Sequence, residues 1–155
     1  MARAKVVVDT NIVIDCVNQR DPFYPDARKL MMCGSVGELD LWVSASQFTD
    51  LVYILSDGGM QSRIPSALER LETLRSFVNV APVDAWCVDR MLATHWNDPE
   101  DALVVEVALA IKADAIVTRD AELRKRSVLP AFDCADLFAW LERTQDVAYD
   151  EVLFA

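Results

Sequence analysis

The segment KVVVDTN, residues 5–11, carries much of the information on how this chain folds. Three consecutive valines without polar alternation are typical of a strand that is covered on both faces, as in a parallel sheet. Asp9 closes this run, and a carboxylate at the end of a buried strand is costly unless it is paired or binds a ligand. Aspartate is also a good N-cap residue. The local sequence therefore leaves helix capping and ligand binding about equally open for Asp9.

Outward from this segment, four more stretches are expected to form strands: Asp40–Val43, Phe77–Val80, Ala115–Thr118 and Val128–Phe132. The helices expected between them are Pro25–Cys33, Ser44–Ser56, Ser62–Arg75, Asp84–Trp96, Pro99–Lys112 and Cys134–Arg143. Ser44 is suited to the N-cap of its helix. The alternation predicts an α/β fold, a three-layer sandwich with a central, mostly parallel five-stranded sheet flanked by helices. Ligands bind such sheets beyond the carboxyl ends of the strands, where the winding direction reverses.

Residues 1–155 are expected to form a single domain, with a core at about 4–143 and a C-terminal tail at 144–155. Hydrophobic residues make up 53% of the chain, which is a globular rather than a disordered composition. No apolar run approaches the roughly 18 residues that a membrane helix needs. The amino terminus also lacks a signal-peptide core. A cytoplasmic protein without membrane association is therefore expected.

The chain has 25 acidic and 15 basic residues, a net charge of −10. This charge argues against a general nucleic-acid binder, which normally has a basic surface. It is compatible with an enzyme whose acids gather where metal binds, if the charge is offset locally. The cysteines, Cys16, Cys33, Cys87 and Cys134, are far apart, and His95 is the one histidine. This pattern disfavours zinc and indicates free thiols.

Three further aspartates stand out by their positions. Asp101 lies at the start of an expected helix, after Asp98, which suits the N-cap. Capping does not require so many acids, and a helix start packed with carboxylates also favours a cation. Asp120 follows an expected strand and either caps a short helix or joins a site. Asp50 lies in the apolar helical stretch Phe48–Leu55. Its side chain either faces solvent or points inward, where it would need a polar or charged partner.

Taken together, these aspartates form a pattern: two follow strands on either side of the expected reversal, and two lie on flanking helices. Their hard oxygen ligands suit Mg²⁺ or Mn²⁺. From about residue 4 to about residue 140, the order of motifs resembles the PIN domain family. The matching segments are VVVDTN (6–11), SASQFTD (44–50), DPEDALVVEVA (98–108) and ADAIVTRDAEL (113–123). The family commonly has Glu where this chain has the shorter Asp50, so direct ligation, ligation through water and no ligation remain open there.

The resemblance implies a metal-dependent endoribonuclease that hydrolyses single-stranded RNA with a metal-activated water. The catalytic, metal-binding residues would be Asp9, Asp101 and Asp120, with Asp50 as a fourth. Asn11 and Thr118 would orient these carboxylates or a water. Asp98 is expected to be an N-cap rather than a ligand. Bound Mg²⁺ or Mn²⁺ would reverse the local field, which otherwise repels a phosphodiester.

The densest basic cluster comprises Arg119, Arg124, Lys125 and Arg126. Its first three members either contact phosphate near the site or belong to a solvated helix end. Trp96 is the tryptophan to examine for base stacking, whereas the other tryptophans are expected to pack in the core or an interface. His95 is expected to be structural.

Two other functions remain open. One is a PIN-like binding or scaffold module with weak catalysis, which the shorter Asp50 and the acidic charge favour. The other is a haloacid-dehalogenase-type phosphatase, which needs a second aspartate where Asn11 stands. Within the nuclease hypothesis, a VapC-like toxin held by an antitoxin protein is attractive. The resemblance to the family also implies a homodimer. The stretch Phe48–Leu55 and the helix after it would suit the dimer interface.

Overall fold

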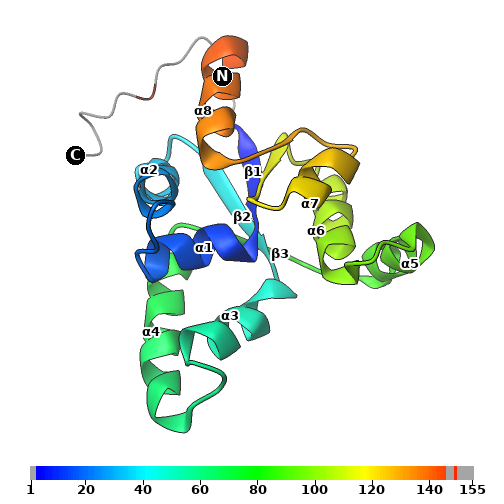
Figure 1. The fold of residues 1–155 in the computed structure, drawn as a ribbon. Helices are drawn as coiled ribbons and strands as arrows, with labels where there is room; N and C mark the ends of the chain where they lie inside the picture. Colours follow the sequence, from blue (N-terminus) through cyan, green and yellow to red (C-terminus); the bar gives the residue numbers. More distant parts are fainter. Residues whose placement is uncertain (1–2, 146–148, 150–155) are drawn as a thin grey trace.

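The computed structural model describes residues 3–145 and 149, and has a five-stranded sheet between helices (Figure 1). The strands are β1 (Lys5–Val8), β2 (Asp40–Ser44), β3 (Asn79–Ala81), β4 (Ala115–Val117) and β5 (Ala131–Phe132). Their order is β3-β2-β1-β4-β5, and each neighbouring pair is parallel. The predicted α/β sandwich is confirmed, with a sheet that is wholly rather than mostly parallel over the described residues.

The chain builds the sheet outward from β1 through β2 to β3, and then returns to the other side of β1 for β4. The winding direction therefore reverses between β1 and β4. This is the place where a parallel sheet leaves a crevice at the carboxyl ends of its strands.

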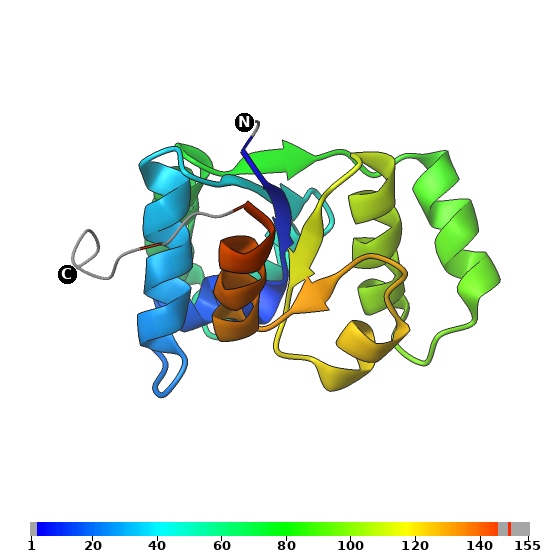
Figure 2. The same cartoon turned by 90° about the horizontal axis from the view of Figure 1, so that it is seen from above.

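Helices cover both faces of the sheet. Their bounds are α1 (Thr10–Val17), α2 (Tyr24–Ser35), α3 (Gln47–Leu55), α4 (Ile64–Arg75), α5 (Ala85–Thr94), α6 (Pro99–Ala110), α7 (Ala121–Arg126) and α8 (Cys134–Gln145), with a short 3₁₀ turn, η1 (Gln61–Arg63), before α4. The larger apolar cluster packs α1–α4 and α8 on one face, and α5–α7 pack on the other. In Figure 2 the green α5 lies outside α6. None of the helices within the described part of the chain has the length and hydropathy to cross a membrane.

Residues of β1 alternate between the two layers, as successive side chains of a strand must. Val6 and Val8 belong to the larger cluster, and Val7 belongs to the cluster under α6. Val7 pairs in register with Trp42 of β2 and Ile116 of β4. Because both faces are covered, the strand is apolar at each of its three buried positions, Val6 to Val8.

Helix α1 was not among the expected elements. It follows β1 after a single residue, and its Ile12, Val13 and Ile14 are buried. β-Branched residues favour strands over helices, so the segment gives no helical signal of its own. Its start is stabilised by Asp9, whose side chain accepts a hydrogen bond from the backbone N–H of Thr10. The short helix after Asp120, in contrast, was an expected alternative and is present as α7.

The expected N-cap at Ser44 is wrong. Ser44 is the last residue of β2, and α3 begins at Gln47. The side-chain oxygen of Gln47 accepts the backbone N–H of Ser44 at 2.8 Å, which holds these residues in a turn. The expected tail at 144–155 lies mostly outside the described residues, although α8 extends to Gln145.

Candidate functional site

Asp9 lies at the reversal point of the sheet and is fixed on two sides. Its backbone N–H donates to the carbonyl of Val117, which extends the β1–β4 pairing by one residue. Its Oδ1 accepts from the backbone of Thr10 and its Oδ2 from the hydroxyl of Thr118, both at 2.8 Å. The side chain is buried, with 6% exposed. Asp9 therefore caps α1 and faces the end of β4 at the same time.

Thr118 connects Asp9 with Asp120. Its fully buried Oγ1 donates to Asp9 and accepts from the backbone N–H of Asp120 at 3.0 Å. The side chain of Asp120 caps α7, because its Oδ1 accepts from the N–H groups of Glu122 and Leu123. One hydroxyl thus fixes the relative positions of two acidic segments, as the orienting role expected for Thr118 requires.

The start of α6 brings in Asp98 and Asp101. Asp98 is the N-cap, since its Oδ1 accepts from the N–H of Asp101 at 3.2 Å. Burial raises the pKa of Asp101 to about 7. Nearby negative charges contribute to this rise, in the order Asp9, Asp98, Asp120 and Glu100. Burial also raises the pKa of Asp9, although its hydrogen bonds from Thr118 and Thr10 oppose the rise.

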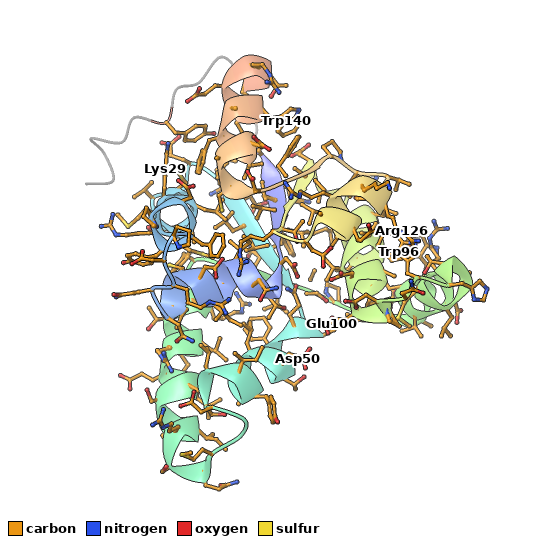
Figure 3. All side chains as sticks on the ribbon, viewed as in Figure 1. Lys29, Asp50, Trp96, Glu100, Arg126 and Trp140 are labelled. Atoms are coloured by element: carbon orange, nitrogen blue, oxygen red, sulfur yellow. The ribbon has the colours of Figure 1, made fainter. Side chains whose placement is uncertain are left out.

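Asp50 and Glu100 form a carboxyl pair between α3 and α6. Figure 3 shows the two residues next to each other where these helices approach. Burial, a hydrogen bond with Asp50 and the charge of Asp50 raise the pKa of Glu100 to about 7. Sequence reasoning assigned Glu100 only to the helix dipole and missed this contact. Asp50 therefore has a polar partner, which a partly buried carboxylate in an apolar helix requires.

Asn11 lies one residue into α1 and is exposed. Within the described residues, its side chain makes no hydrogen bond, while its carbonyl oxygen accepts from Arg20 at 3.4 Å. The expected orienting role therefore has no counterpart in protein contacts. The amide remains accessible to water or to a ligand.

Gln47 is a second residue that sequence reasoning missed. It is fully buried, and its Nε2 donates to the carbonyl of Val8 and to the hydroxyl of Thr10, at 3.0 and 3.1 Å. With its oxygen on Ser44, this one amide joins the carboxyl ends of β1 and β2. A buried polar side chain beside a carboxylate site is satisfied in full, which keeps the edge of the sheet rigid.

The donor set at this edge fits a hard divalent cation. The charges of carboxylates from four segments contribute, after burial, to the raised pKa values of Asp9, Glu100 and Asp101, and either protonation or a cation relieves that repulsion. Within residues 3–145 and 149, no group of three or more His, Cys, Asp or Glu is already arranged to hold a metal. The chemistry of the donors thus suits Mg²⁺ or Mn²⁺, and ligation would require the carboxylates to draw together.

The basic residues expected to contact phosphate differ in their surroundings. Arg119 donates through Nε and Nη2 to the buried Asp15, and its guanidinium lies 3.8 Å from the centroid of the Phe23 ring. Arg124 lies 3.6 Å from Asp133, and its Nε is buried without an acceptor among the described groups. Lys125 is exposed. Arg119 is therefore already held by the fold.

The remaining candidates are placed by packing. Trp96 packs partly buried against the cluster under α6, and the Arg126 guanidinium lies over its ring at 5.6 Å (Figure 3). His95 is the C-cap of α5, with φ of 53°, and is exposed. The four cysteines are free thiols, three of them buried and Cys16 partly so.

Comparisons with known proteins identify the family and the fold. A family model described as PIN domain matches residues 5–122. No curated protein matches the chain significantly.

Several solved structures have a similar fold but low sequence identity to this chain. VapBC2 from Rickettsia felis bound to a DNA fragment from its promoter is 17% identical, with a TM-score of 0.60 over 83% of this chain and 97% of that chain. A toxin–antitoxin complex from Klebsiella pneumoniae is 14% identical, with a TM-score of 0.62 over 83% and 97%. PAE2754 from Pyrobaculum aerophilum is 18% identical, with a TM-score of 0.62 over 91% of each chain.

Proposed function

The chain belongs to the PIN domain family, and from this premise we propose that it is an endoribonuclease dependent on Mg²⁺ or Mn²⁺ that hydrolyses single-stranded RNA. One observation carries the proposal. Asp9, Asp101 and Asp120 come from three different segments, and burial, followed by the charges of Asp9, Asp98, Asp120 and Glu100, raises the pKa of Asp101 to about 7. Thr118 also joins Asp9 to the backbone of Asp120 through its hydroxyl. Such a concentration of charge at a reversal point is costly to a fold unless it serves a cation.

Asp9, Asp101 and Asp120 would hold the metal, directly or through water. When bound, a divalent cation would lower the pKa of a coordinated water and offset the negative charge of the scissile phosphate. Thr118 holds Oδ2 of Asp9, so it sets the direction of the free lone pairs of that carboxylate. Exposed Asn11 would position the water or the RNA strand.

Asp50 and Glu100 together would provide the fourth acidic position. Asp50 is one methylene shorter than the glutamate that is common in the family, and Glu100 approaches it from the opposite helix. This hydrogen-bonded pair would make up for the shorter side chain. Lys125, which makes no ion pair with the described residues, would contact phosphate further along the strand.

As a partner we propose an antitoxin protein, so that the chain would be the cytoplasmic toxin of a toxin–antitoxin pair. Support comes from the fold shared with proteins whose structures include a toxin–antitoxin complex. A homodimer is proposed as well. A hollow between α3 and α4 is lined by Phe48, Val52 and the exposed Leu68. Tyr53 and Ile54 of α3 are also exposed, so these two helices present the apolar surface that an interface between copies would require.

The second candidate is a PIN-like scaffold with weak catalysis. It is favoured by the shortened Asp50 and by the lack, within the described residues, of three ligands already in metal-binding geometry. Direct assay separates the two candidates.

The deciding experiment measures cleavage of a fluorescent single-stranded RNA by the purified chain with Mn²⁺, with Mg²⁺ and with EDTA. Asp101→Asn should abolish metal-dependent cleavage. Replacing a residue that only orients a metal ligand typically lowers activity by roughly 10–100-fold, so the loss at Asp101 should be larger. Asp89→Asn, which removes an exposed carboxylate from α5, is the matched control and should behave as wild type. Equal cleavage by both variants would refute the site, and absence of cleavage by the wild type would favour the scaffold.

A further inference from the structure

A cavity of about 320 Å³ lies beside the acidic site. It opens to solvent and is lined by α1, the start of α2 with the segment before it, the turn after β4, α7 and the start of α8. Arg119, in its wall, stands between Thr118 and Asp120 in the chain, and Ile12 is three residues beyond Asp9. The cavity therefore shares two segments with the candidate site and has the size of a small-molecule pocket.

One wall of the cavity is a flat stacking platform. Phe23 is 39% exposed, and the planar guanidinium of Arg119 lies 3.8 Å from the centroid of its ring. Asp15 holds that guanidinium through two hydrogen bonds, at 2.7 and 3.1 Å, and it also pairs with Arg20. The platform is thus rigid, and Asp15 is fully used in holding it. Aromatic rings and arginine planes are the surfaces on which unpaired bases stack.

A second wall offers a hydrogen-bond donor next to an acceptor. Arg124 Nη1 lies 3.6 Å from Asp133 Oδ2, and the buried Nε of Arg124 has no acceptor among the described groups. Asp133 uses its other oxygen, Oδ1, to cap α8 through the N–H of Asp136 at 2.8 Å. Asp26 adds another carboxylate to the lining. The Arg124 side chain is 32% exposed, and its Nη groups make no hydrogen bond with the described residues. Both walls together thus provide a stacking surface, a guanidinium with free Nη donors and carboxylate acceptors.

This combination disfavours a phosphate, because Asp26 and Asp133 would repel it. A neutral, planar ligand with paired acceptors beside N–H donors fits better. Guanine has this arrangement, because an arginine fork can donate to its O6 and N7 while N1–H and N2–H₂, on the adjoining Watson–Crick edge, donate to a carboxylate. Cytosine also has paired acceptors, N3 and O2, but lacks the two neighbouring N–H groups that a carboxylate binds, and adenine and uracil have no adjacent pair of acceptors.

We propose that this cavity binds an unpaired guanine base of the RNA, adjacent to the phosphodiester that the acidic site cleaves. The biological meaning of the inference rests on the proposed ribonuclease function. Binding of the base itself needs neither metal nor cleavage, so the two proposals can fail separately.

The first test titrates the full metal-free chain with guanosine, adenosine, cytidine and uridine, and follows backbone amide shifts by NMR. Guanosine should bind saturably at millimolar concentration, with amides around Phe23 and Arg124 shifting most. It should bind about 10-fold more tightly than the other nucleosides, within the range of one bidentate contact. Absence of saturable guanosine binding, or equal binding of all four nucleosides, would overturn the proposal.

Variants assign the binding to the cavity. Arg124→Lys keeps the charge but removes the fork, so the preference for guanosine should disappear. Phe23→Leu should weaken all four nucleosides through lost stacking. Arg143→Lys, near the other end of α8 and outside the cavity, is the matched control for an arginine-to-lysine exchange and should keep the preference for guanosine. Thermal melting checks that each variant is folded, and an unchanged guanosine preference in Arg124→Lys would reject the assignment.

A cleavage arm then separates the two proposals. Short RNAs that differ by one guanine-to-adenine exchange are incubated with Mn²⁺ and wild type, and cleavage beside the guanine should be faster. Arg124→Lys should cleave both RNAs at similar rates. Cleavage of both RNAs at equal rates by wild type would refute the guanine site but support the ribonuclease function. Selective guanosine binding without any RNA cleavage would support the guanine site but refute the ribonuclease function.

Discussion

The fully buried carboxylate of Asp15 accepts two hydrogen bonds from Arg119, one from Nε at 2.7 Å and one from Nη2 at 3.1 Å. Arg119 belongs to the turn after β4 that carries Thr118 and Asp120, and Asp15 belongs to α1, which Asp9 caps. The pair therefore ties together the two segments that meet at the reversal point of the sheet.

Replacing Asp15 with Asn should destabilise the fold. The buried position would lose its charge, and one of the two acceptor oxygens used by Arg119 and Arg20 would be replaced by an amide N–H₂ donor. Because both arginines are partly exposed and can be hydrated, the expected loss is about 2–3 kcal/mol in the free energy of unfolding, below the full cost of a broken buried pair. Urea denaturation measures it.

The control is Asp57→Asn, which breaks the exposed pair between Asp57 and Arg63. Surface pairs contribute little, so the loss should stay within about 0.5–1 kcal/mol. Asparagine also tolerates the positive φ of 52° at this position. Similar losses in the two variants would show that Asp15 does not anchor the turn.

Replacing Thr118 with Val should uncouple Asp9 from Asp120. Valine has the shape of threonine but lacks the hydroxyl that both segments use. Mn²⁺ affinity, measured by calorimetry, should fall roughly 10–100-fold, as for other groups that orient a ligand. Thr118→Ser keeps the hydroxyl and should bind Mn²⁺ nearly as wild type does. Unchanged Mn²⁺ affinity in Thr118→Val would show that Thr118 does not support the metal site.

The sheet and part of the site were predictable because their signals are local. Runs such as Val6–Val8 identify buried strands, and the alternation of strands and helices places Asp9 and Asp120 on either side of the reversal. The contact between Asp50 and Glu100 was not predictable, because it depends on how α3 packs near α6. The same holds for Asp15, whose partner Arg119 is 104 positions away. Helix α1 was not predicted because its β-branched residues are more typical of strands than of helices.

Asp50 and Glu100 should behave as a coupled pair. Asp50→Asn, Glu100→Gln and the double variant form a cycle, read out as Mn²⁺ affinity. Because the two carboxyls share a hydrogen bond, their effects should be non-additive, with a coupling of about 0.5–3 kcal/mol. The matched control pairs Asp50→Asn with Asp89→Asn, which is on α5 and should add independently. Additive effects in both cycles would show that the pair does not act together.

Stability without metal should fall as pH rises from about 5 to 8. The pKa values of Asp101 and Glu100 are about 7 in the fold, against ordinary values of 3.8 and 4.5. Between these limits the folded state binds more protons than the unfolded state, so the free energy of unfolding decreases with pH. The pKa of Asp84 is lowered by its hydrogen bond from Cys87, so Asp84 affects stability only below about pH 4 and does not oppose the trend.

Metal should reverse this dependence, because Mn²⁺ binds deprotonated carboxylates and stabilises only the state that holds them together. Thermal melting in EDTA and in excess Mn²⁺, at pH 5 and pH 8, measures both effects. The Tm in EDTA should be lower at pH 8, and the increase caused by Mn²⁺ should be larger there. Asp101→Asn should flatten the pH dependence in EDTA and reduce the Mn²⁺ effect, whereas Asp89→Asn should change neither. If the Tm in EDTA instead rises toward pH 8, the carboxylates do not repel one another, and the electrostatic basis for a cation at this edge of the sheet is lost.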